Sequence, residues 1–371
     1  MTLAAPGVTE PCEAVTALDA PAATSRRDAT RRDPTRRDLT GRDADRCAVG
    51  LVVVFAALAV AVGLHAGTRT MDVDEAVFLR TLTAMHHGAG YYDAMRRALV
   101  MKEGTAPSQL RSIRPPTMFV LLAPLPPWSW RWVVGVVDAA VLAMVWRLAR
   151  SVRAWGGPVA VVLAGLWMVG AAPMLYLHAE LWGLPFALAG VVAARRERWA
   201  MAAVGIGIAV AFRELYAGLF VLSLLVAPRR RPWLIVGAGL AGFAAAHAAL
   251  ASSALTVHGH EPALGSGART LRYALSCLSP SDRPLGWIVG VATTVAGVTV
   301  LASLVRRRLA TIDTAVVVFV VVMIVLTVTL GRVYWGLTTG PLLACYAPGA
   351  WPLLRRLRRP APRAVPAPLR A

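Results

Sequence analysis

Long apolar runs recur along the whole of this sequence, and short clusters of arginine stand between many of them. An apolar run of about 20 residues can cross the hydrocarbon core of a bilayer as a helix. Of the 371 residues, 57% are hydrophobic and only 16% are charged, which is too little polar surface for a soluble domain. The sequence therefore predicts an all-α fold, namely a polytopic membrane bundle of helices.

We expect about ten membrane-spanning helices. The three runs between 182 and 227 are shorter than a straight crossing needs, so we expect these helices to be tilted, broken or extended at their ends. The predicted spans are 48–66, 131–149, 157–176, 182–194, 199–212, 215–227, 233–255, 285–305, 312–330 and 336–354.

The arginine clusters predict the orientation of the bundle, because basic residues concentrate in cytoplasmic loops. If the N-terminal tail is cytoplasmic and the spans alternate, every short arginine cluster falls on the cytoplasmic side. Merging 199–227 into one helix would move the later clusters outside, so we expect two helices there. Both termini are then cytoplasmic. The clusters lie at 147–153, 195–198, 229–231, 306–308 and 355–359.

The chain is predicted to have three parts: a disordered basic cytoplasmic tail at 1–47, a transmembrane domain at 48–358 and a short cytoplasmic tail at 359–371. The first tail has no hydrophobic periodicity and cannot build a core. It either contacts anionic lipid or is simply solvated. Two large extracytoplasmic loops are expected, at about 67–130 and 256–284. The first should contain short helices lying in the membrane interface.

The net charge of +19 does not indicate a nucleic-acid partner, because the arginines stand at the ends of apolar runs, where topology signals belong. We expect membrane lipids as partners and no nucleic acid. The four cysteines are scattered and have no metal-ligand spacing. The sequence therefore predicts no cofactor and gives no support for a divalent metal.

Three carboxylates follow the first span, in "MDVDEAVF": Asp72, Asp74 and Glu75. Asp72 and Glu75 have the spacing of a capping box, so a structural role as a helix start is one interpretation. A carboxylate near the bilayer surface is also well placed to act as a base. Both roles are compatible.

Charged residues interrupt the apolar runs in two later turns. "LHAELW" contains His178 and Glu180, and "AFRELYAG" contains Arg213 and Glu214. Ionisable residues at membrane depth are costly and are functional candidates by default. The alternative is a mutual ion pair or hydrogen bonding between helices.

Further cations are predicted on the same outer face. Arg114, in "SIRPPTMF", can hold a phosphate or extend to lipid head groups. Arg332 lies beside Tyr334 in "GRVYWG", which otherwise has the composition of an aromatic belt. Acids and arginines from distant segments thus converge on one face, as expected for a site that binds an anionic amphiphile.

The acidic first loop, the run from "YYDAMRRAL" to "IRPPTMFVLLAPLP", the "FRELYAG" turn and the closing "GRVYWGLTTGPLLACYAPGAWPLL" resemble the integral-membrane GT-C glycosyltransferases of GC-rich bacteria. The resemblance covers about residues 50 to 358. It implies an inner-membrane enzyme that moves a hexosyl or pentosyl group from a polyprenyl-phosphate donor to a lipid or glycan acceptor on the extracytoplasmic face. It also implies that Asp72, Asp74 or Glu75 is the base.

The chemistry of such a transfer is consistent with the residues. A leaving phosphate needs fixed positive charge, for which Arg114, Arg213 and Arg332 are candidates. Two alternatives stay open: a transporter or flippase for lipids or solutes, and a non-catalytic membrane protein of the same fold. P-loop and serine-hydrolase motifs do not occur in the sequence.

Overall fold

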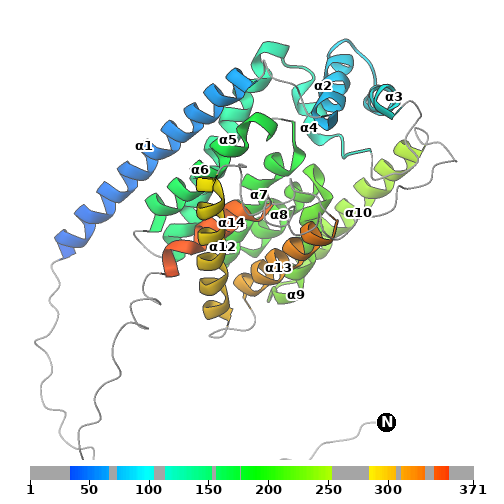
Figure 1. Cartoon of the computed structure of the whole chain (residues 1–371). Coiled ribbons are helices and arrows are strands. Elements are labelled where there is room, and N and C mark those ends of the chain that lie inside the picture. The colour runs from blue at the N-terminus through cyan, green and yellow to red at the C-terminus, as the bar shows by residue number, and fades with distance from the viewer. Residues whose placement is uncertain are drawn as a thin grey trace, which may run out of the picture. The chain divides into compact units, whose positions relative to one another are not determined.

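The computed structural model describes residues 34–66, 73–103, 113–152, 156–175, 177–252, 284–305, 311–330 and 338–350. The chain divides into two units, Met1–Thr40 and Gly41–Ala371. Of the first unit, only the start of helix α1 (Pro34–Ala66) is described. Every regular element in the described ranges is helical (Figure 1). The predicted tail at 359–371 and nearly all of the predicted loop at 256–284 lie outside these ranges.

Three stretches of helix in the described part are long and apolar enough to cross a membrane: Asp43–Val62, Pro127–Val152 and Arg231–Ser252. They correspond to most of α1, to η2 (Pro127–Ser129) with α5 (Trp130–Val152), and to α10 (Arg231–Ser252). Their length and composition support a membrane-associated chain. Shorter apolar helices lie within other predicted spans, at Gly156–Val169, Trp199–Phe212, Glu214–Val226, Gly290–Val300 and Ile312–Leu326.

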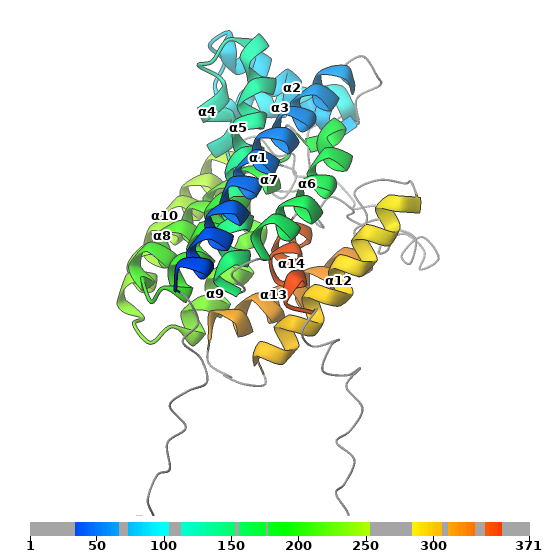
Figure 2. The ribbon, with the colours of Figure 1, turned by 90° about the vertical axis from the view of Figure 1, so that its left-hand side faces the viewer.

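Short helices of the predicted first outer loop gather at one end of the helical bundle (Figure 2). They are α2 (Val73–His86), α3 (Tyr91–Glu103) and α4 (Thr117–Leu122). The indole of Trp130, at the start of α5, donates hydrogen bonds to the carbonyls of Leu122 and Leu125 at 2.9 and 3.0 Å. These bonds fix the end of α4 to the first turn of α5.

Helix α7 (Ala179–Arg195) is buried on nearly all its sides and packs against α5 and α8 (Trp199–Phe212). A helix that is apolar all round belongs in a core. Glycines bring α7 and α8 close together: a Cβ built on Gly205 would lie 3.0 Å from the carbonyl oxygen of Phe186 and 3.1 Å from backbone atoms of Gly190. Small residues commonly allow such close contact between membrane helices.

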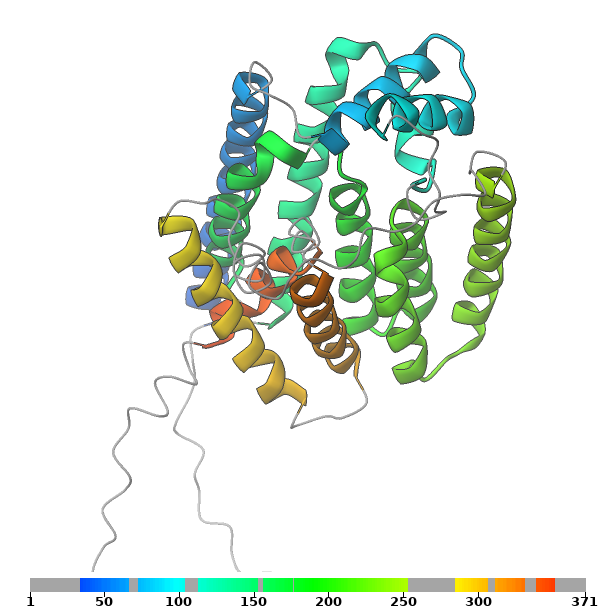
Figure 3. The same ribbon diagram turned by 45° about the vertical axis from the view of Figure 1, so that its right-hand side comes forward.

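The helical path breaks at Arg213. Its backbone is extended (φ −152°, ψ 119°) between the end of α8 and the turn η3 (Glu214–Tyr216), which leads into α9 (Ala217–Val226). The structure therefore has two helices within 199–227. At the edge of the bundle, α10 lies beside α8 (Figure 3) and buries little of its surface.

The predicted span at 336–354 is described from 338 to 350. Its described residues form α14 (Gly340–Tyr346) and the turn η5 (Ala347–Gly349). Helix α14 is buried against α5, α6 (Gly156–Leu175) and α12 (Pro284–Val305). The "APG" sequence of η5 explains the interruption after α14, because proline and glycine both disfavour a continuing helix. Ala350 is helical again, and residues 351–354 of the predicted span lie outside the described residues.

The remaining helix, α13 (Ile312–Leu330), is held at its start by ionic contacts. Asp313 lies 2.8 Å from a guanidinium nitrogen of Arg195, at the end of α7, and accepts a hydrogen bond of 2.9 Å from the hydroxyl of Tyr346. Helix α1 is longer at its N-terminal end than predicted, because it begins at Pro34 and the predicted span begins at 48.

Candidate functional site

A cluster of charged side chains lies where α7 begins and α8 ends. His178 is the extended residue before α7, and Glu180 is in the first turn of that helix. Arg213 follows α8, and Glu214 opens η3. A short turn joins α7 to α8 and the two helices pack together along their length, so the start of one lies beside the end of the other.

Glu180 and Arg213 form a buried ion pair. The Nε of Arg213 donates to Oε1 of Glu180 at 2.6 Å, and the side chains are only 4% and 1% exposed. Desolvating two charges is costly, and close contact with hydrogen bonding offsets that cost. The hydroxyl of Tyr216 donates to the backbone carbonyl of Glu180 at 2.7 Å and holds the first turn of α7 in place. The pair therefore fixes a guanidinium in the wall of the site.

Glu214 joins two arginines. Its Oε1 accepts a hydrogen bond from an NH1 donor of Arg213, and the same oxygen lies 3.8 Å from NH1 of Arg114. The Glu214 side chain is 53% exposed and that of Arg114 is 20% exposed. The outermost carboxylate of the cluster thus lies between two guanidinium groups.

The backbone around Arg114 is held by α3 and α10. The hydroxyl of Tyr91 donates to the carbonyl of Arg114, and burial raises the pKa of Tyr91 well above its ordinary value, so it remains a donor at neutral pH. Ring nitrogen Nε2 of His247 lies 3.2 Å from the carbonyl oxygen of Ile113. A carbonyl only accepts, so Nε2 carries the proton and Nδ1 accepts from the hydroxyl of Tyr92 at 3.0 Å.

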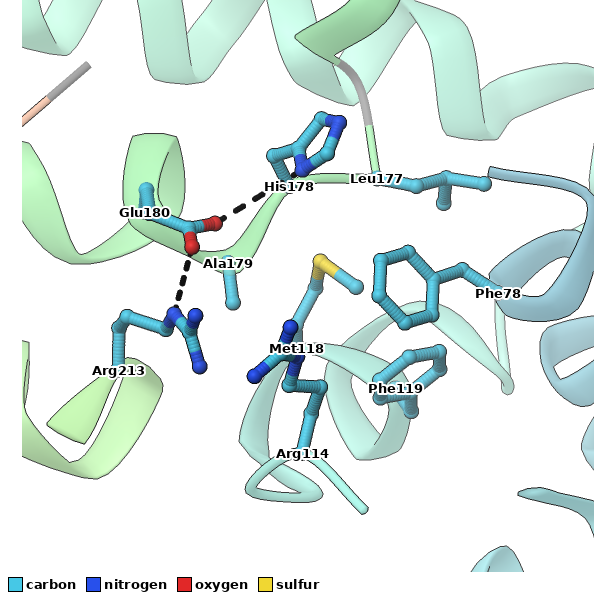
Figure 4. Close-up of a pocket in the computed structure, with 9 residues that line it drawn as sticks. All are labelled: Phe78, Arg114, Met118, Phe119, Leu177, His178, Ala179, Glu180 and Arg213. Carbon is cyan, nitrogen blue, oxygen red and sulfur yellow. Dashed lines mark hydrogen bonds and ion pairs between the residues drawn. The ribbon is translucent and has the colours of Figure 1, made fainter. Parts of the chain in front are cut away.

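The charged residues form one side of a pocket, and an apolar wall faces them (Figure 4). The phenyl ring of Phe78 meets the His178 ring edge-on, with centroids 6.2 Å apart, and Nδ1 of His178 is 3.9 Å from Oε2 of Glu180. The free space is about 10 Å³, which is near the minimum for one water molecule. The pocket is lined by Phe78, Arg114, Met118, Phe119, Leu177, His178, Ala179, Glu180 and Arg213.

This arrangement matches the chemistry of an anionic amphiphile. Arginine forms charge-assisted hydrogen bonds with phosphate oxygens, often in pairs. The opposite wall, made mainly by Phe78, Met118 and Phe119, offers apolar surface.

The structure brings together five of the predicted site residues. Arg114, His178, Glu180 and Arg213 line the pocket, and Glu214 bridges its two arginines. Asp74 and Glu75 are in the first turn of α2, the helix that contributes Phe78 to the pocket, and only their backbone is described. Asp72, Arg332 and Tyr334 lie outside the described residues.

Sequence reasoning missed the apolar wall. Phe78, Met118 and Phe119 come from two short helices whose packing depends on contacts distant in sequence, and only the apolar periodicity of α2 indicated that Phe78 is buried. It also missed Asp138, a buried acid in α5 whose Oδ1 has no hydrogen-bond partner among the described residues. The sequence signal for a functional role of Asp138 was its position as a single acid within an apolar run.

Within the described part of the chain, no group of three or more His, Cys, Asp or Glu residues is arranged to hold a metal ion. Comparison of the chain with protein-family models, with curated proteins and with solved structures finds no match.

Proposed function

We propose that this chain is a bacterial inner-membrane glycosyltransferase of the GT-C type, with about ten spans and cytoplasmic termini. It transfers a hexosyl or pentosyl group from a polyprenyl-phosphate donor to a lipid or glycan acceptor on the extracytoplasmic face. One observation carries the proposal: the pocket in which Arg114 and Arg213 face an apolar wall at the α2–α4 end of the bundle.

The donor's chemistry corresponds to the two walls of this pocket. Its phosphate pairs with the guanidinium groups, and the first part of its apolar chain lies against Phe78 and Phe119. As the bond to the sugar breaks, negative charge grows on the leaving phosphate. Fixed positive charge stabilises that state more than the ground state. Arg332 and Tyr334 are proposed as further contacts to the donor.

A hydroxyl acceptor must lose a proton during the displacement, and a carboxylate in hydrogen-bond reach can take it. We assign this role to one of the first-loop acids Asp72, Asp74 and Glu75. Asp74 precedes Phe78 by about one helical turn in α2. The backbone of α2 therefore leads from Asp74 and Glu75 towards the pocket wall.

The proposal is tested with purified protein in vesicles that contain a radiolabelled polyprenyl-phosphate sugar and a membrane lipid extract as acceptor source. Release of polyprenyl phosphate is measured for the wild type and for D72N, D74N and E75Q. Loss of a general base lowers turnover roughly 10²- to 10⁴-fold, so one of the three variants should fall by that amount. E197Q, which changes an exposed acid in the turn between α7 and α8, is the matched control and should retain turnover.

Turnover that survives all three changes, at equal protein levels, rules out a first-loop base. A wild type that never releases polyprenyl phosphate overturns the enzyme proposal and leaves a non-catalytic protein of similar architecture.

A second candidate function is a lipid or solute transporter. It is favoured by the break at Arg213 between α8 and α9, since transporters often place broken helices at their binding sites. Movement of the labelled donor between the two leaflets without acceptor and without loss of sugar would distinguish transport from transfer.

A further inference from the structure

The position of Glu214 is unusual for a structural carboxylate. The guanidinium of Arg213 is almost fully buried and already has one partner in Glu180, bound through Nε. Its NH1 group points towards Glu214, whose side chain is half exposed. The cluster therefore contains one acid built into the core and one acid at its surface, and the two acids contact different nitrogens of one arginine.

The surface acid occupies the point where positive charge converges. A single oxygen, Oε1 of Glu214, contacts Arg213 and lies 3.8 Å from Arg114. Two guanidinium groups directed at one oxygen are the usual surroundings of a phosphate or carboxylate ligand. In this structure the protein's own carboxylate takes that place.

The charges change if Glu214 moves away. Arg114 and Arg213 contribute +2, and Glu180 and Glu214 contribute −2, so the four groups are neutral together. Removing the charge of Glu214 makes the surroundings of the two arginines one unit more positive, which favours an anion in its place. The Glu214 side chain is half exposed, so its carboxylate can turn to solvent while Glu180 stays paired with Arg213. Glu180 is buried, so removing its carboxylate from Arg213 costs more.

We propose that Glu214 is the resting occupant of a phosphate-binding site formed by Arg114 and Arg213, and that a phosphate-bearing ligand binds by displacing it. The identification of the anion as phosphate rests on the proposed function. The site then takes the phosphate of a lipid or a free phosphate ion.

Calorimetric titration of the purified full-length protein in neutral detergent tests this inference. One arm uses dodecyl phosphate in mixed micelles, and the other uses inorganic phosphate. E214Q keeps the shape of the side chain and removes its charge. It should bind the anion roughly three- to tenfold more tightly than the wild type, because the internal competitor is weakened. R114Q and the double variant R114Q/E214Q should both lose most of this binding.

Two controls keep the result specific. R230Q changes an exposed arginine between α9 and α10, and E197Q changes an exposed acid between α7 and α8. Both should bind as the wild type does. Thermal unfolding of E214Q should match the wild type, because this side chain is half exposed.

Tighter binding of both anions by E214Q supports a site that needs only the phosphate group. Tighter binding of dodecyl phosphate alone supports a lipid-borne phosphate. Unchanged or weaker binding by E214Q in both arms, or no binding by any form of the protein, overturns the inference. The readout does not depend on sugar transfer, so tighter binding by E214Q together with full turnover in the first-loop variants would uphold this site and reject the proposed base.

Discussion

The hydroxyl of Tyr92 in α3 lies 3.0 Å from Nδ1 of His247 in α10, a residue 155 positions later in the chain. Because His247 also contacts the carbonyl of Ile113, this ring connects α3 and α10 to the residue before Arg114. The geometry of the candidate site thus depends on a helix that buries little of its own surface.

Removing this connection should loosen the short helices at that end of the bundle. Y92F deletes the hydroxyl that donates to His247, and a hydrogen bond of this kind contributes about 0.5–1.5 kcal/mol. We expect faster amide hydrogen exchange in α3, measured by mass spectrometry in detergent. H87A, which alters an exposed ring bonded within its own helix, should leave that exchange unchanged. Equal protection of α3 in Y92F and the wild type would contradict the connection.

Breaking the buried pair of Glu180 and Arg213 should be strongly destabilising. E180Q removes the buried carboxylate that pairs with Arg213, whose side chain is 1% exposed, and such changes cost about 3–5 kcal/mol. The double variant E180L/R213M should cost less than either single change, because both buried charges are removed together. Unfolding midpoints in detergent would measure both.

A more exposed ion pair provides the comparison. Asp45 in α1 and Arg150 in α5 are 2.6 Å apart, with side chains 29% and 51% exposed. D45N should cost about 0–1 kcal/mol. If E180Q and D45N shift the midpoint equally, burial of the Glu180–Arg213 pair has no energetic consequence.

The contact between α7 and α8 should not tolerate a methyl group at Gly205. All three nearest atoms to a Cβ there are backbone atoms of α7, at 3.0–3.1 Å, so neither helix can relieve the contact by rotating a side chain. We expect G205A to lower stability by about 1–3 kcal/mol. G239A in α10 is the matched control, because its Cβ would have no atom within 4 Å. That variant should be neutral or slightly stabilised, since alanine favours a helix over glycine.

Asp138 should be replaceable with a gain in stability. The residue is 2% exposed, and its Oδ1 has no hydrogen-bond partner in the part of the chain that the structure describes, an arrangement that costs free energy. We expect D138L to raise the unfolding midpoint by the equivalent of about 1–3 kcal/mol. A variant that is more stable but has lost its activity would mark this carboxyl as functional. A destabilised D138L would show that the carboxyl is satisfied in the folded protein.

Composition and hydropathy were sufficient to predict an all-helical, membrane-associated chain, because apolar runs of spanning length have few other solutions. The charged turns were also recognisable, since His178, Glu180, Arg213 and Glu214 interrupt those runs. Their meeting in space could be inferred from alternating topology, which places the corresponding turns at one end of the bundle.

Other features needed tertiary packing. A proline and a glycine in η5 interrupt the helix after α14, a local break that hydropathy averages away. Phe119 faces the charged cluster because contacts distant in sequence orient α4. One of them is a hydrogen bond of 2.5 Å from the hydroxyl of Thr117 to the carbonyl of Ala211. The sequence of α4 by itself does not indicate that Thr117 contacts Ala211.

Arg213 is both the single extended residue between α8 and η3 and the most deeply buried cation of the cluster. A rotation of η3 and α9 about this residue would therefore move Glu214 relative to the buried pair of Arg213 and Glu180. Such a rotation would change the electrostatic potential in the pocket, so a ligand that alters that potential would also favour one orientation of α9.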